Sequence, residues 1–315
     1  MSRRLKTAEH AEQFECFGGY CSVLVSGGDG RSSAARAARA AHQTLLDWHR
    51  RFSRFLPDSE LSLLNEDPRD EVPASELMLR LAEAVRTAGE LSGGLVDATL
   101  AREIELAGYA ADLSAARLPS RLVAALAPRR APASPHPDAR WREVEVDSIR
   151  GTVIRPPGVR IDSGGLAKGL FADVLAEQLA GHAAYAVDCA GDLALGGTAA
   201  LPRAVHVQSP FDGGTLHTFA LSVGAVATSG ITRRSWLDGD GQPAHHLLNP
   251  ATGAPAFTGV VQATALAPSA LEAEIRAKAA LLAGPRGAAE HLRHGGAVVS
   301  DDGSCAVFQP ALSIT

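Results

Sequence analysis

A glycine-rich turn followed by a lysine is the part of this sequence best suited to phosphate chemistry. An apolar segment, residues 159–161, runs into Asp162, a Ser-Gly-Gly turn and a predicted helix that carries Lys168, Gly169 and Asp173. Glycines let the backbone approach a ligand closely, and a helix N-terminus directs N–H groups at an anion. The segment therefore predicts an anion cradle to which Lys168 adds a cation. An ordinary strand–turn–helix with a solvated lysine fits the same residues.

This turn matches neither of the two common nucleotide-binding loops. No Gly-Lys-Ser/Thr sequence follows it, which excludes a Walker loop, and its glycine spacing differs from the GxGxxG of dinucleotide-binding folds. A second candidate phosphate site is Ser229-Gly230, at the end of a predicted strand, because a hydroxyl and glycine N–H groups suit phosphate oxygen. The same dipeptide is also common in turns.

Two adjacent histidines, His245 and His246, precede a predicted Asn-Pro turn. Neighbouring residues of a strand point to opposite faces, so the two cannot serve one site together. His246 is a candidate general base, and the alternative is a histidine that hydrogen-bonds the turn. The sequence has no HExxH motif and no third imidazole at a spacing that supports zinc.

Composition restricts the classes of function open to this chain. Its 315 residues carry a formal net charge of −5, which gives no basic surface for nucleic acid, and a hydrophobic content of 46% is enough for a substantial core. The four cysteines form no CxxC pair and are expected to be free buried thiols of a reducing compartment. The start lacks the apolar stretch of a signal peptide, and no run reaches the roughly 18 apolar residues of a membrane helix. We therefore expect a cytoplasmic protein without a membrane segment.

Periodicity and capping residues predict where the helices and strands lie. Helices are expected over 32–52, 75–92 and 270–283, with a short helix capped by Asp58 or Ser59. Apolar runs predict strands at 14–25, with a kink at Gly18-Gly19, and at 159–161, 184–187, 205–208, 216–223, 226–228 and 261–267. Hairpins are expected at 141–154 and 297–308. The Pro- and Arg-rich stretch 118–139 predicts an exposed connection, and residues 1–13 are expected to form a flexible tail.

Five segments in a fixed order carry a resemblance to one protein family. They are residues 54–65 (RFLPDSELSLLN), 161–169 (IDSGGLAKG), 187–192 (VDCAGD), 227–230 (ATSG) and 246–253 (HLLNPATG). In sequence and order they resemble the motifs of the ApbE-like flavin transferases, which are FAD:protein FMN transferases. The resemblance spans about residues 14–300, nearly the whole chain.

The resemblance implies a fold and an activity. The fold is α+β, with mixed β-sheets packed with outer helices in a single domain over residues 14–315. The activity is transfer of FMN from the substrate FAD to a Thr or Ser hydroxyl of an acceptor flavoprotein, with release of AMP. Two alternatives remain open at this point: an FAD diphosphatase that gives FMN and AMP, and a non-catalytic FAD-binding protein.

The resemblance also implies roles for individual residues. His246 stands where the family has its histidine and is expected to act as the base, with Lys168 on the phosphates. The residues expected to bind the cofactor are Phe17, Asp97, Thr99, Asp162, Gly165, Lys168, Asp173, Asp192, Ser229 and Gly230. Phe17-Gly18-Gly19 replaces the family's Met-Gly-Thr, so the threonine hydroxyl is missing. Asp97 and Thr99 could instead cap a helix at 100–107.

The metal site implied by the resemblance is altered in this sequence. The family binds Mg²⁺ through an Asp and a Thr four residues apart on a helix and through a backbone carbonyl, which corresponds here to Ala167. The matching side chains are Glu274 and Lys278. Glutamate can still bind Mg²⁺, whereas a protonated lysine has no lone pair to donate. The pair could also be a simple helical ion pair, or Lys278 could supply the positive charge in place of the metal.

Overall fold

The chain folds around one large antiparallel sheet. A computed structural model describes residues 9–27, 31–110, 118–199 and 201–309. The main sheet has eight strands in the order β1-β2-β6-β7-β10-β13-β14-β15, and each neighbouring pair is antiparallel. These strands are β1 (Glu9–Cys16), β2 (Gly19–Ser26), β6 (Ala184–Cys189), β7 (Asp192–Gly196), β10 (Gly224–Gly230), β13 (Val260–Ala267), β14 (Gly296–Ser300) and β15 (Cys305–Phe308). The expected α+β fold of β-sheets with outer helices is confirmed.

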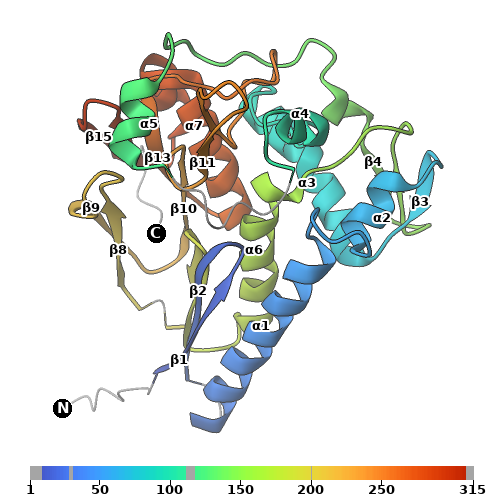
Figure 1. Cartoon of the computed structure of the whole chain (residues 1–315). Helices are drawn as coiled ribbons and strands as arrows, with labels where there is room; N and C mark the ends of the chain where they lie inside the picture. The colour runs from blue at the N-terminus through green and yellow to red at the C-terminus, as the bar shows by residue number, and fades with distance from the viewer. Residues whose placement is uncertain (1–8, 28–30, 111–117, 200, 310–315) are drawn as a thin grey trace.

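Three helices cover one face of this sheet (Figure 1). α1 (Arg31–Arg51) packs on β1 and β2, α6 (Ala167–Leu179) on β6 and β7, and α7 (Ala270–His291) on β10 and β13. A further helix, α3 (Glu76–Ser92), packs against α6 and α7. Phe171 of α6 is fully buried between these layers, and its ring contacts the rings of Trp48 and Phe52. The hydrophobic core therefore fixes the start of α6, which carries the glycine-rich turn.

Smaller elements surround this core. β8 (Arg203–Gln208) and β9 (Thr215–Leu221) form a ribbon whose Val207 and Phe219 pack on Val226 of the main sheet. A three-stranded sheet, in the order β3-β5-β4, lies beside α3. The remaining elements are α2 (Glu60–Glu66), β3 (Glu71–Pro73), α4 (Ala101–Leu106), α5 (Ser120–Leu126), η1 (Arg140–Glu143), β4 (Glu145–Asp147), β5 (Thr152–Ile154), η2 (Ser163–Gly165), β11 (Ser235–Leu237) and β12 (Pro243–His245).

Serine side chains cap the starts of α2, α3 and α7, and of the two residues predicted to cap the short helix, Asp58 and Ser59, it is Ser59 that does so. The Ser59 hydroxyl accepts a hydrogen bond from the backbone N–H three residues later, and Ser75 and Ser269 do the same at α3 and α7. Such a cap satisfies one of the four N–H groups that a helix start leaves unpaired. At the other end of α3, Gly93 adopts the left-handed conformation that stops the helix.

The N-terminal segment differs from the prediction. β1 begins at Glu9, so residues 9–13 are paired strand rather than flexible tail, while residues 1–8 lie outside the described residues. The single strand expected over 14–25 is wrong, because the chain reverses at Phe17-Gly18 and β1 pairs with β2. Phe17 and Gly18 both have positive φ, 55° and 68°, as a tight two-residue hairpin requires. The two glycines predicted a kink at Gly18-Gly19, and the structure has a full reversal one residue earlier.

The apolar segment before the glycine-rich turn is also not a strand, which corrects the prediction for residues 159–161. Its backbone is held by a side chain instead: the Asn65 amide donates to the Ile161 carbonyl and accepts from the Ile161 N–H, both at 2.8 Å. The next N–H, of Asp162, donates to the Ala98 carbonyl at 2.8 Å. A buried amide therefore replaces a neighbouring strand and fixes the entry to the turn.

We expect that replacing Asn65 with leucine lowers the free energy of unfolding by about 1–3 kcal/mol, because two buried backbone groups of Ile161 lose their partner. Urea unfolding followed by circular dichroism measures this change. The matched control is Leu63→Ala on the same helix, where the side chain is 60% exposed and the change should stay within about 0.5 kcal/mol. Equal midpoints for both variants would contradict the role given to Asn65.

Two other predicted segments contain more structure than expected. The Pro- and Arg-rich connection at 118–139 is largely exposed but includes α5, whose Val123 is fully buried. The Ala133 N–H donates to the Leu282 carbonyl at 2.8 Å, which ties the connection to α7. In α7 the helical backbone breaks at Gly284, close to the predicted end at 283, and a second helical segment follows Pro285 to His291.

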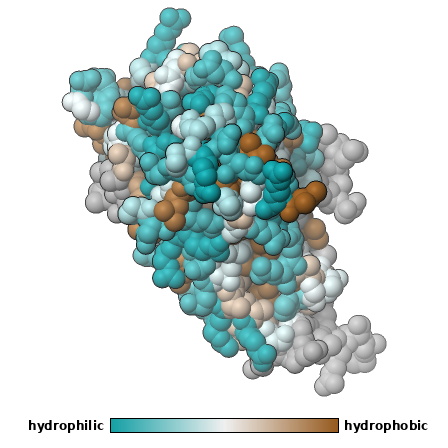
Figure 2. Space-filling view, turned by 90° about the vertical axis from the view of Figure 1, so that its right-hand side faces the viewer, coloured by the Kyte–Doolittle hydropathy of each residue, from teal (hydrophilic) through white to brown (hydrophobic). Residues whose placement is uncertain are grey.

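The surface gives no sign of a membrane-spanning element among the described residues. None of the described helices is long and apolar enough to cross a membrane. On the face shown in Figure 2, the coloured residues are mostly hydrophilic, and the hydrophobic ones form small separate patches. Scattered apolar side chains of this kind are ordinary on a protein surface.

Candidate active site

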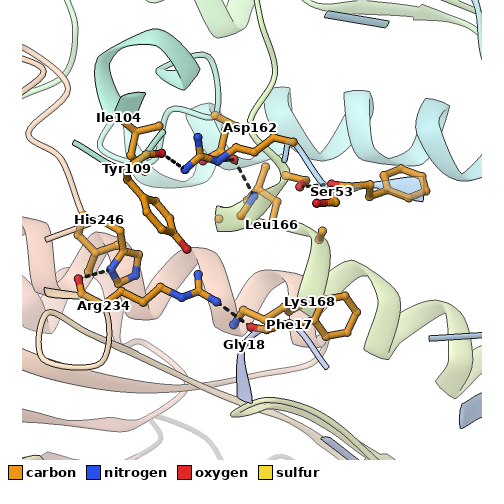
Figure 3. Close-up of a pocket in the computed structure, with 18 of the residues that line it drawn as sticks. Phe17, Gly18, Ser53, Ile104, Tyr109, Asp162, Leu166, Lys168, Arg234 and His246 are labelled. Carbon is orange, nitrogen blue, oxygen red and sulfur yellow. Dashed lines mark hydrogen bonds and ion pairs between the residues drawn. The ribbon is translucent and has the colours of Figure 1, made fainter. Parts of the chain in front are cut away.

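A cavity of about 870 Å³ opens where the β1–β2 hairpin, the start of α6 and the segment after β10 meet. Its volume lies within the range of small-molecule and cofactor sites. In Figure 3, Asp162 and Ser53 lie along one side, and Lys168, Arg234 and His246 lie along the other. The ring of Tyr109 extends from the first side toward the second. The cavity thus brings together segments that are far apart in the sequence.

Lys168 reaches the cavity from the first turn of α6, as predicted for the cradle. Its ammonium forms a hydrogen-bonded ion pair with Asp192, whose side chain is 1% exposed at the start of β7. Lys168 Nζ also lies 3.6 Å from Glu274 Oε1. Buried carboxylates therefore hold the lysine, while its own side chain is still part of the cavity wall.

Gly169 lets α6 and α7 approach closely enough to complete this cluster. A Cβ at this position would lie 2.6 Å from the Ala270 carbonyl oxygen and 2.8 Å from the Leu271 Cα, so any larger residue would force the helices apart. The Gly169 N–H donates to Glu274 Oε2 at 2.9 Å. On the other carboxylate oxygen, Glu274 Oε1 accepts from Lys278 Nζ at 2.8 Å. The Glu274 side chain is fully buried behind the cavity wall.

Burial and neighbouring charges act against each other on these four groups. Burial lowers the pKa of Lys168, but Asp192 and Glu274 more than offset this and hold it above its usual value. Burial lowers the pKa of Lys278, with Glu274 opposing it. Burial raises the pKa of Glu274, but the combined effect of the Lys278 and Lys168 cations is larger, so this pKa lies below its usual value. Burial, followed by repulsion from Glu274, raises the pKa of Asp192 to about 7.

The residues present do not fit the Mg²⁺ site implied by the family resemblance. Both oxygens of Glu274 already accept hydrogen bonds, from Lys278 and from the Gly169 backbone. Lys278 offers an ammonium, which has no lone pair for a metal. Ala167 lies at the cavity wall, so its carbonyl would be the remaining ligand of the expected set. Among the residues that the structure describes, no group of three or more His, Cys, Asp or Glu side chains could hold a metal ion.

His246 lines the cavity with its imidazole in a defined orientation. Its Nδ1 lies 3.4 Å from the Arg234 carbonyl oxygen, which can only accept a hydrogen bond, so Nδ1 carries the proton. Nε2 then carries the lone pair. Burial, and next the Arg234 cation, hold the pKa of His246 well below its usual value. The neutral imidazole can therefore accept a proton, as a general base must.

The arginines at this cavity were not predicted from the sequence. Arg233 and Arg234 lie three and four residues after Gly230 in the chain, and both line the cavity. The Arg234 guanidinium also donates to the Phe17 carbonyl at 2.8 Å and so ties the hairpin turn to the site. Their position beside a predicted phosphate-binding dipeptide was the signal available in the sequence.

Arg54 forms a second unpredicted feature on the opposite side. Its guanidinium lies over the rings of Phe55 and Tyr109, 4.4 and 4.6 Å from their centres, and its Nε is 3.7 Å from Asp162. The Tyr109 ring stacks in turn on Trp236. This cluster holds the cavity wall rigid around Asp162, whose Oδ1 accepts the Gly164 N–H at 3.1 Å.

The structure places about half of the predicted residues on the cavity wall. Those that line it are Phe17, Asp97, Asp162, Gly165, Ala167, Lys168, His246 and Lys278. Those absent from the wall are Thr99, Asp173, Asp192, Ser229, Gly230 and Glu274. Asp192 and Glu274 lie directly behind it and contact Lys168. They act through the lysines rather than by touching a ligand in the cavity.

Three residues predicted to bind the cofactor have other surroundings in the structure. The Asp173 carboxylate accepts the Ala270 and Leu271 N–H groups and so caps the start of α7. Thr99 donates its hydroxyl and its N–H to Asp97, and neither residue caps α4. Ser229 is buried in β10, opposite β13.

Comparisons with known proteins agree with this arrangement. The ApbE family model matches residues 17–299, which is most of the chain. The chain belongs to the ApbE family. Its relatives include two proteins named FAD:protein FMN transferase. That of Treponema pallidum is 28% identical over 72% of this chain and 66% of the relative, and that of Klebsiella pneumoniae is 28% identical over 90% of this chain and 81% of the relative.

Solved ApbE structures have the same fold. The ApbE protein of Thermotoga maritima matches with a TM-score of 0.78 at 25% identity, covering 95% of this chain and 97% of that one. The apo form of the flavinyl transferase ApbE from Pseudomonas stutzeri matches with a TM-score of 0.74 at 18% identity, covering 98% of this chain and 97% of that one. The ApbE fold therefore extends over nearly the whole chain.

Proposed function

We propose that this protein transfers FMN from FAD to a Thr or Ser hydroxyl of an acceptor flavoprotein and releases AMP. Membership of the ApbE family and the names of its relatives support this activity. The observation that carries the proposal is the shared cavity wall, which combines the neutral imidazole of His246 with the cations of Lys168, Arg233 and Arg234. A base and several cations around one cavity suit attack on a diphosphate.

The proposed reaction breaks the phosphoanhydride bond of FAD and forms a phosphodiester bond to the acceptor. The acceptor hydroxyl oxygen attacks the phosphorus on the riboflavin side of FAD, and its proton passes to Nε2 of His246. The bond between that phosphorus and the bridging oxygen breaks, and AMP leaves with this oxygen. Lys168, with Arg233 and Arg234, offsets the charge that develops on the phosphate oxygens. The described residues therefore supply the base and the charge stabilisation.

Two parts of the sequence-based prediction stand outside this mechanism. The Mg²⁺ ion implied by the resemblance has no role in this mechanism, because the Glu274–Lys278 pair does not fit a divalent cation. The cytoplasmic location remains a proposal, supported by the four cysteines, which are free thiols.

Product analysis tests the proposed activity against the two alternatives. The protein is incubated with FAD and a candidate flavoprotein domain, and FAD, FMN and AMP are separated by chromatography. Transfer predicts AMP release that requires the acceptor, with no matching free FMN. The matched control is the acceptor with its target Thr or Ser replaced by alanine, which should abolish AMP release. Equal amounts of free FMN and AMP would indicate a diphosphatase, and bound but unchanged FAD would indicate a non-catalytic protein.

A further inference from the structure

Two lysines and two carboxylates alternate in a buried cluster where α6, β7 and α7 meet. Lys168 and Lys278 line the cavity, whereas Asp192 and Glu274 are 1% and 0% exposed behind them. Lys278 Nζ lies 2.8 Å from Glu274 Oε1, and Lys168 Nζ lies 3.6 Å from the same oxygen. The cluster thus presents its positive charges to the cavity and keeps its negative charges inside the protein.

We propose that Lys278 replaces a divalent cation, so that binding and reaction of the FAD diphosphate need no metal in this protein. This inference rests on the proposed function and specifies how the same site handles phosphate charge. The ammonium of Lys278 is held by its hydrogen bond to Glu274, and its Cε lies 3.5 Å from where a Cβ of Gly165 would be. The fixed ammonium therefore lies beside the glycine-rich turn predicted to hold phosphate.

The chemistry of an ammonium suits this role. It carries three N–H donors, so a single bond to Glu274 leaves capacity for phosphate oxygens on the cavity side. A magnesium ion bound to Glu274 would lie against the Lys278 ammonium, which repels a cation and has no lone pair to donate. The two lysines together supply the same charge as one divalent cation. Asp192 and Glu274 balance this charge when the cavity holds no diphosphate.

The first test measures FAD affinity of the wild-type protein by flavin fluorescence, in excess EDTA and in excess MgCl₂. Metal-independent binding predicts affinities within about twofold of each other. The double variant Glu274→Asp with Lys278→Thr restores oxygen ligands at both positions. It should bind FAD at least about tenfold more tightly with MgCl₂ than with EDTA, and MgCl₂ should raise its melting temperature.

A matched control is available on the same helix. Glu272 and Arg276 form another ion pair four residues apart, with Nε to Oε1 at 2.7 Å, and neither lines the cavity. Glu272→Asp with Arg276→Thr makes the equivalent change away from the site and should leave FAD affinity independent of MgCl₂. If the site double variant does not fold, Lys278→Arg serves instead and should keep metal-independent binding, because it keeps the charge.

Three results would overturn the inference. They are an FAD affinity of the wild type that falls about tenfold or more in EDTA, a folded site double variant that gains no response to MgCl₂, and an Lys278→Arg variant whose FAD binding requires MgCl₂. With intact binding and transfer in MgCl₂, each of these would leave the proposed function standing. Failure to bind FAD under either condition would instead contradict the proposed function, and the inference with it.

Discussion

Replacing His246 with alanine is expected to slow FMN transfer by roughly 10²–10⁴-fold while FAD affinity stays nearly unchanged, because a general base acts on the acceptor hydroxyl rather than on bound FAD. The hydrogen bond from Nδ1 to the Arg234 carbonyl fixes the tautomer and leaves the Nε2 lone pair for the proton. Single-turnover transfer and FAD titration separate the two quantities. A variant with unchanged transfer would assign His246 to a structural role.

A second variant and a pH profile separate catalysis from packing at this position. His246→Asn can still donate a hydrogen bond to the Arg234 carbonyl, but an amide cannot accept the proton, so it should be as slow as the alanine variant. The wild-type rate should not decrease as the pH is lowered through about 6.5, the ordinary pKa of histidine. Burial and Arg234 hold the pKa of His246 well below that value, so the base form persists.

Replacing Lys168 with methionine is expected to lower the free energy of unfolding by about 3–5 kcal/mol, because it removes the cation bonded to the buried Asp192. Adding Asp192→Asn should recover most of this loss, since no unpaired carboxylate then remains. Both variants should bind FAD at least about tenfold more weakly, because a charged hydrogen bond to phosphate is lost. Urea unfolding and FAD titration measure the two effects.

The control for Lys168 removes one positive charge from an ion pair at the surface. Arg80 bonds Glu177 there, with side-chain exposures of 31% and 59%. Arg80→Met should cost only about 0–1 kcal/mol and leave FAD affinity unchanged. If Lys168→Met costs no more than this control, Asp192 does not depend on Lys168 for its charge, and the description of the cluster is wrong.

Local rules predicted much of the fold. Ser75 and Ser269 begin α3 and α7 because a hydroxyl can satisfy a helix N–H wherever the chain places it. Contacts between distant segments explain the errors. Residues 159–161 were predicted to form a strand, but the hydrogen-bond partner of Ile161 is the side chain of Asn65, ninety-six positions earlier in the chain. The hairpin at Phe17-Gly18 is a different case, because β1 and β2 are consecutive strands and Phe17 takes a positive φ that is unusual for a residue other than glycine.

The residues of the candidate site also fall into two groups, those that a local motif predicted and those that depend on contacts with distant segments. Lys168 and His246 stand in motifs whose residue types already indicate phosphate binding and proton transfer, and the structure brings both to one cavity. Asp173 lies on the same helix as Lys168 but caps α7, a role that depends on a helix about a hundred residues later in the chain. The guanidinium of Arg54 is positioned by the rings of Phe55 and Tyr109, and the contact with Tyr109 joins residues 55 positions apart, so no local pattern predicted it.

The intact mass of an acceptor flavoprotein domain, recorded after incubation with FAD and this protein, tests the central claim most directly. Transfer predicts that the acceptor gains the mass of one FMN moiety and that fragmentation places it on a Thr or Ser. The gain should be absent with the alanine-substituted acceptor. An acceptor of unchanged mass, while FAD is converted to FMN and AMP, would contradict the account.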